Sequence, residues 1–197
     1  AALSVALNYI EGFARGSQTK VNRNFMEIAY GSLKEAEYLF TFSLRENYLS
    51  STDYEEAKKV TLAAVEISGP VYLRFGRERS PIITTEHTPF KIGRAEVFKD
   101  GKDVTIFACG SLIYNAIKAA LDLERERISV AVINIHTIKP LDKDTILKYA
   151  RNTRAAVTVE EHQIHGGLGG ALAEFLAKES PVPMEFIGVQ DKFGESG

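Results

Sequence analysis

Two acidic residues and a histidine stand directly before a glycine-rich turn in the second half of the chain. Residues 157–170 read VTVEEHQIHGGLGG, which predicts a strand, a turn and the start of a helix. Open α/β sheets bind ligands at the carboxyl ends of their strands, and the free amides of a helix amino terminus can bind an anion. The pattern is therefore compatible with a binding site. It is also typical of a turn whose glycines, Gly166, Gly167 and Gly169, only let the helix pack closely on the strand.

The three polar residues of this stretch, Glu160, Glu161 and His162, could form an acid–base cluster. Because neighbouring residues of a strand point to opposite faces of the sheet, only Glu160 and His162 share a face. That pair has the chemistry of a proton-transfer site, and it is also typical of a polar contact at an interface. We favour the interface contact and predict no catalytic residue in this chain.

Two arginines follow another apolar run. Residues 71–75 read VYLRF and predict a buried strand, with Arg74 and Arg77 near its end. A guanidinium that emerges from a strand can bind a phosphate through its planar array of donors. An ion pair with Glu78 explains the same pattern, and the residues alone do not separate the two interpretations.

The remaining residues exclude several kinds of site. The chain has one cysteine, Cys109, and four histidines, without the spacing of a metal site. His136 follows a predicted strand, where we expect core or turn packing rather than catalysis. The Gly-x-Ser-x-Gly motif of many serine hydrolases is absent from the sequence.

Charge and composition limit the partners and the location of the chain. The formal net charge is -2, which argues against a nucleic-acid or anionic-membrane partner. No apolar run approaches the roughly 20 residues that span a bilayer. Since a single cysteine cannot form an intrachain disulfide, we expect a cytoplasmic protein. The sequence begins with Ala1 and ends with Gly197, from which we expect both ends to be truncated.

The elements that must position these residues change in character near residue 52. Before it, apolar residues recur every three or four positions, which predicts helices at 1–15 and 19–47. A third helix is expected from 52 to the Gly69-Pro70 pair, and residues 76–91 form a linker. From 92 onward, buried strands alternate with helices, which predicts a mainly parallel α/β sheet with flanking helices. The expected strands are 103–109, 129–135, 155–160 and 184–188, and the expected helices are 112–126, 142–152 and 167–178.

Several segments, in this order, resemble the carboxyl-terminal part of transketolases. The resemblance covers roughly residues 53–197, and because separate motifs agree in register it is more specific than one glycine turn. The segments are 69–78 (GPVYLRFGRE), 101–106 (GKDVTI), Cys109-Gly110, 134–140 (NIHTIKP), 160–169 (EEHQIHGGLG) and 193–197 (FGESG).

The resemblance implies an enzyme that transfers two-carbon ketol units between sugar phosphates, using thiamine diphosphate and magnesium. It implies that residues 53–91 are the tail of a pyrimidine-binding domain plus a linker. Residues 92–197 are then the carboxyl-terminal domain, which packs and dimerises. Arg77 matches the family arginine that contacts the substrate phosphate. A family signature without an assigned chemical role is matched by Glu160, Glu161, His162, Gly166, Gly167 and Gly169.

The family's diphosphate-binding motif and its cofactor-activating glutamate are absent from the sequence. Without that glutamate the proton relay that activates the cofactor has no driver, and one arginine cannot position a substrate. We therefore expect neither a cofactor bound to this chain alone nor independent activity.

Residues 1–50 resemble a different family, the four-helix-bundle proteins encoded by intervening sequences of 23S ribosomal RNA. The similar segments are 9–17 (YIEGFARGS), Phe25, Ile28-Ala29 and 31–37 (GSLKEAE). That family forms small oligomeric bundles, which implies a helical oligomer through residues 1–52. We interpret the nearby basic residues, Arg15, Lys20 and Arg23, as a solvated helix face rather than an RNA site.

The leading hypothesis is a transketolase-like carboxyl-terminal domain, at 92–197, behind an appended helical segment, at 1–52. In this hypothesis the chain is inactive alone. A first alternative is an oligomerising helical interaction module. A second is one subunit of a split transketolase or deoxyxylulose-phosphate synthase, completed by a partner with the missing domains.

Overall fold

The computed structural model describes residues 51–67, 71–74, 81–85 and 87–193, together with single positions between 24 and 45. The chain forms two compact units, Ala1–Phe75 with Thr84–Thr88, and Gly76–Ile83 with Pro89–Gly197. The described positions between 24 and 45 are helical. Among them, the rings of Tyr38 and Phe42 stack with centroids 6.3 Å apart, as residues one helical turn apart do. The rest of the predicted helices 1–15 and 19–47 lies outside the described residues.

The first unit contains helix α3, from Ser51 to Val65. Its Thr61 donates a hydroxyl hydrogen bond to the carbonyl of Ala57 at 2.7 Å. The strand predicted at 71–75 is wrong for its described part, because residues 71–74 form no strand and Tyr72 is 83% exposed. A strand needs a neighbour for its backbone hydrogen bonds, and the described residues of this unit supply none.

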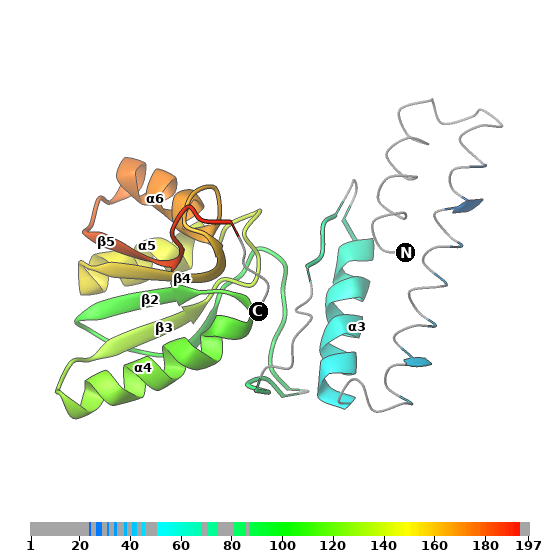
Figure 1. The fold of residues 1–197 in the computed structure, drawn as a ribbon, viewed down its shortest axis with the longest axis horizontal. Coiled ribbons are helices and arrows are strands. Elements are labelled where there is room, and N and C mark those ends of the chain that lie inside the picture. The colour runs from blue at the N-terminus through cyan, green and yellow to red at the C-terminus, as the bar shows by residue number, and fades with distance from the viewer. Residues whose placement is uncertain are drawn as a thin grey trace. The chain divides into compact units, whose positions relative to one another are not determined.

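The second unit is an α/β sheet with helices on both faces (Figure 1). Four strands are parallel, and β1 joins β3 in the antiparallel direction at one edge, giving the order β1-β3-β2-β4-β5. The strands are β1 Glu96–Lys99, β2 Val104–Ala108, β3 Val130–Asn134, β4 Ala156–Gln163 and β5 Met184–Val189. The helices are the short η1 Gly110–Leu112, α4 Ile113–Arg125, α5 Lys143–Thr153 and α6 Leu168–Glu179. The mainly parallel α/β fold predicted from the sequence is confirmed.

The predicted elements of this unit agree with the structure except at one edge and one strand end. Strand β4 continues to Gln163, past its predicted end at residue 160. Strand β1 was not predicted, because its four residues, EVFK, are too few to show a clear alternation.

The two faces of the sheet carry separate apolar cores, because successive residues of a strand point to opposite sides. Phe107 packs with Leu172 of α6 and Ile146 of α5 on one face. Its neighbour Ile106 packs with Ala116 of α4 on the other. Strands β2 and β4 are adjacent in the sheet. The helices that follow them, α4 and α6, cover opposite faces. Their carboxyl ends form a topological switch point, where open α/β sheets place ligands.

Candidate functional site

The buried carboxylate of Glu160 forms the centre of the switch point. Its side chain lies near the end of β4 and is only 3% exposed. The amide of Leu168 donates to Oε2 at 2.7 Å, and the amide of Gly169 donates to Oε1 at 2.8 Å. Both amides belong to the first turn of α6, whose N–H groups have no partner within the helix. Glu160 thus caps α6 from the neighbouring strand.

The glycines of the turn make this approach sterically feasible. A Cβ on Gly167 would lie 2.0 Å from Oε2 of Glu160, and one on Gly169 would lie 2.7 Å from Cδ1 of Phe186. Gly166 has a φ of +76°, a conformation that favours glycine. The close-packing interpretation of these glycines therefore describes the observed contacts. Two of the amides that an external anion could use are already bound to Glu160.

His162 shares a face with Glu160, but the two side chains are not hydrogen-bonded. Nδ1 of His162 lies 4.0 Å from Oε2 of Glu160. The same nitrogen donates to the carbonyl of Gln163 at 2.8 Å. The imidazole is about half exposed. The pair is thus arranged as a buried cap beside a solvent-facing histidine, and the 4.0 Å between Nδ1 and Oε2 exceeds hydrogen-bond distance.

Glu161 points to the opposite side of β4 from Glu160. It links β4 to the segment that follows β2. The hydroxyl of Ser111, in η1 after β2, donates to Oε2 of Glu161 at 3.0 Å. The sequence reasoning did not single out Ser111. Its position directly after the strand end at Cys109-Gly110 was the signal that could have found it.

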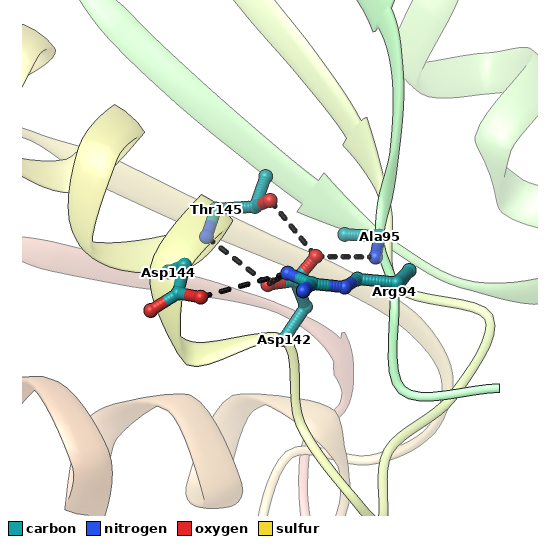
Figure 2. A network of polar contacts seen from close by, with 5 residues as sticks. All are labelled: Arg94, Ala95, Asp142, Asp144 and Thr145. Atoms are coloured by element: carbon teal, nitrogen blue, oxygen red, sulfur yellow. Dashed lines mark hydrogen bonds and ion pairs between the residues drawn. The ribbon is translucent and has the colours of Figure 1, made fainter. Parts of the chain in front are cut away.

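A second polar cluster joins the start of β1 to the start of α5 (Figure 2). Asp142 accepts from the amide of Ala95 at 2.8 Å, and from the amide and hydroxyl of Thr145 at 3.2 and 2.8 Å. Nη1 of Arg94 lies 3.5 Å from Oδ1 of Asp142 and 3.5 Å from Oδ2 of Asp144. Burial raises the pKa of Asp142, but these hydrogen bonds and the Arg94 charge outweigh it and hold the pKa below its ordinary value. Asp142 thus caps α5 and also bonds to the residue that precedes β1.

His136, the candidate residue that follows β3, contacts an aromatic ring and a hydroxyl group. The ring of His136 packs on that of Phe90, with centroids 4.7 Å apart, and its Nδ1 lies 3.0 Å from the Thr137 hydroxyl. Burial lowers the pKa of His136. This is the packing role expected from the sequence. Arg74 is exposed on a segment without secondary structure, and Arg77 lies outside the described residues.

The described residues do not fit a diphosphate and magnesium site. Among them, no group of three or more His, Cys, Asp or Glu side chains is placed to hold a metal ion. Two amides of the first turn of α6, which could otherwise contribute to binding a diphosphate, are bound by Glu160. No helix in the described part of the chain is long and apolar enough to cross a membrane.

The fold and its switch point define the second unit as an open α/β domain of the mainly parallel class. The chain belongs to the transketolase family, since residues 93–197 match the family described as transketolase, C-terminal domain. Residues 1–67 match a second family, described as 23S rRNA-intervening sequence protein. Both resemblances drawn from the sequence are confirmed, and the second extends past residue 50.

Curated relatives include proteins named as transketolase subunits. The 6-deoxy-6-sulfo-D-fructose transketolase subunit SqwH of Clostridium sp. (strain MSTE9) is 39% identical over 160 residues, covering 79% of this chain and 50% of that protein. An apulose-4-phosphate transketolase subunit of Phocaeicola vulgatus is 36% identical, covering 84% and 55%. The 1-deoxy-D-xylulose-5-phosphate synthase of Desulfitobacterium hafniense is 33% identical, covering 76% and 24%. The chain thus spans about half the length of the two transketolase subunits and about a quarter of the synthase.

A solved structure described as a split gene transketolase, inactive beta4 tetramer, is also similar. It is 43% identical, with a TM-score of 0.69, and the match covers 73% of this chain and 48% of that chain. The α/β architecture described above is therefore shared with a transketolase subunit of known structure.

Proposed function

We propose that this chain contributes the carboxyl-terminal domain of a thiamine diphosphate enzyme that transfers ketol units between sugar phosphates. The family match of residues 93–197 is the observation that carries the proposal. We assign residues 1–52 to a helical segment, 53–91 to the tail of the pyrimidine-binding domain with its linker, and 92–197 to the carboxyl-terminal domain. When bound in the complete enzyme, the cofactor supplies the carbanion chemistry, which no described residue of this chain replaces.

In this proposal the 197 residues are inactive alone, because their sequence does not include the family's diphosphate-binding motif. Calorimetry with thiamine diphosphate and magnesium chloride should show no binding to the purified chain. Xylulose phosphate should not be turned over. A micromolar binding isotherm, or turnover by the chain without another protein, would contradict the proposal.

A more specific form of the proposal makes the chain one subunit of a split enzyme. Two relatives are named as transketolase subunits, and the chain matches about half of each. Mixing the chain with a protein that carries the family's diphosphate-binding domain should then restore turnover. In that mixture, Arg77→Ala should raise the KM for the sugar phosphate, whereas Arg74→Ala should leave it unchanged. Absence of a complex between the two proteins would exclude the split arrangement for that pair.

In the assembled enzyme, we assign the signature residues of the switch point to positioning and contact. Glu160, Gly167 and Gly169 hold the turn, which leaves Glu161 and His162 on the surface for contact with another domain or a second copy. A homodimer is the assembly that the family resemblance favours. The single cysteine is not in a disulfide, which supports placing this function in the cytoplasm.

The helical segment provides a second, separable candidate function. The match of residues 1–67 to a family of helical proteins favours oligomerisation through residues 1–52. Light scattering measures the molecular mass of the assembly formed by the full chain and of that formed by a version lacking residues 1–52. A smaller assembly after the deletion is the expected result, and an unchanged one would exclude this function.

A further inference from the structure

The edge strand β1 is held at both ends by side chains of a single helix, α5. Before the strand, the amide of Ala95 donates to Asp142, the amino-terminal cap of α5 (Figure 2). After the strand, the hydroxyl of Tyr149, two turns further along α5, donates to Oδ1 of Asp100. Neither bond belongs to the β1–β3 ladder. Helix α5 therefore clamps β1 independently of strand pairing.

The attachments of β1 within the sheet are weak by comparison. The strand has four residues, and none of them is fully buried. Phe98 packs against the edge of one apolar core, and Lys99 forms an ion pair with Glu124 of α4 at 3.3 Å. Its pairing with β3 is interrupted by a register shift between Val97 and Lys99, and Val97 is 41% exposed. Short, partly exposed elements with few buried apolar contacts open at lower free energy than the rest of a domain.

The strand that β1 covers is among the most buried in the sheet. Residues Val130 to Ile133 of β3 are all 0% exposed. Its edge would present unpaired backbone groups and an apolar sequence to other chains if β1 left it. The two clamps thus hold in place the element that protects this edge.

We propose that β1 is a strap that opens and closes on β3 separately from the rest of the sheet. The Asp142 and Tyr149 bonds add to the free energy of opening, and the closed strap prevents β3 from pairing with another copy of the chain. This inference concerns the fold itself and holds whether or not the proposed function is correct.

Native-state hydrogen exchange of the full chain tests the separate opening. The segment 95–100 should exchange at least tenfold faster than β2 in the unchanged protein. Tyr149→Phe removes the clamp hydroxyl but keeps the ring, so it should accelerate exchange of 95–100 by about fivefold, the effect of one hydrogen bond. Thr153→Val is the matched control on the same helix, because it removes bonds to Thr105 of β2 and to the carbonyl of Tyr149. It should accelerate β2 and leave 95–100 unchanged.

The results that would overturn the proposal are equally specific. If Thr153→Val accelerates 95–100 as much as β2, the strap has no opening of its own. If Tyr149→Phe leaves 95–100 unchanged, the hydroxyl is not a clamp. Light scattering of the same proteins tests the protection of β3. Tyr149→Phe should self-associate several times faster than Thr153→Val, and equal rates would overturn that part.

Discussion

Glu160 and Gly167 lie so close together that no side chain fits between them. A Cβ on Gly167 would lie 2.0 Å from Oε2 of Glu160 and 2.8 Å from Nδ1 of His162. The same carboxylate binds the amides of Leu168 and Gly169. The shape of the glycine turn is therefore set by an anion of the chain itself, bound at the helix terminus.

Replacement of Gly167 by alanine should destabilise the second unit. The new methyl group has to displace the buried Glu160 carboxylate, and both amide bonds of the cap would lengthen or break. We expect a loss of about 2–4 kcal/mol in the free energy of unfolding, the range of overpacking combined with a lost buried polar contact. Denaturant unfolding followed by circular dichroism measures it.

Gly170→Ala is the matched control for this substitution. Gly170 lies three residues away in α6, and a Cβ there would meet no atom within 4 Å. Alanine is favoured over glycine within a helix by up to about 1 kcal/mol, so this variant should be as stable as the parent or more stable. Equal stabilities of the two variants would show that the contact with Glu160 is not limiting.

Glu160→Ala should also destabilise the chain, by leaving two buried amides without an acceptor. Hydrogen bonds to a charged group contribute about 1.5–3 kcal/mol each, so the loss of two of them should cost roughly 3–6 kcal/mol. Glu161→Ala tests the neighbouring acid, which is exposed, and should cost less than about 1 kcal/mol. Thermal unfolding of both variants is the measurement, and a larger effect at Glu161 would contradict the assignment of the buried cap to Glu160.

The parts of this fold that could be predicted from the sequence are those whose signal is local. Strand β3 is a run of consecutive buried apolar residues, and Asp142 lies directly before the helix that it caps. Strand β1 exists because it pairs with β3, some 35 residues later in the chain, and its own four residues carry little signal. The opposite error occurred at Val71, where an apolar run predicted a strand but no partner strand is present among the described residues.

Prediction of the candidate site from the sequence has the same limit, because its contacts join residues that are distant in the chain. The glycine pattern left open whether the backbone approaches a ligand or the helix only packs closely on the strand, and the sequence could not identify the approaching group. That group is the side chain of Glu160, which reaches Leu168 only because α6 folds back onto β4. The bond between Ser111 and Glu161 likewise depends on β2 and β4 being neighbours, which is a property of the strand order.

His136 should titrate below its ordinary value. Burial disfavours the charged imidazolium, so the pKa of His136 in the folded chain lies below 6.5. The folded chain is therefore not penalised above the pKa that His136 has in the unfolded chain. It loses stability as the pH falls from there through the lower pKa of the folded chain. NMR titration, with the resonance assigned by its loss in His136→Gln, gives the midpoint. A midpoint at or above 6.5 would contradict the burial of this ring.

Asp142 should make the second unit sensitive to acid. Burial raises the pKa of Asp142. The opposite effect is larger and holds the pKa below its ordinary value, and it comes from the amides of Ala95 and Thr145, the Thr145 hydroxyl and the Arg94 charge. Because the folded pKa lies below the unfolded one, the stabilisation is complete above about pH 4 and is lost as the pH falls through the folded pKa. Asp142→Asn removes the charge and keeps a side chain that can cap a helix. It should cost roughly 1–2 kcal/mol at pH 7, because the single amide oxygen of asparagine cannot accept all the bonds that both carboxylate oxygens now accept.

The same variant separates this carboxylate from the other acids of the chain. The free energy of unfolding is measured for both proteins at pH 7 and at successively lower pH. The difference between them should shrink with acid, because the parent loses an interaction that Asp142→Asn already lacks. Asp144→Asn is the control, since Asp144 is exposed and bonded only to Arg94 in this cluster, and its difference from the parent should stay small throughout. A difference for Asp142→Asn that does not change with pH would mean that the cap stabilises the chain through its shape and not through its charge.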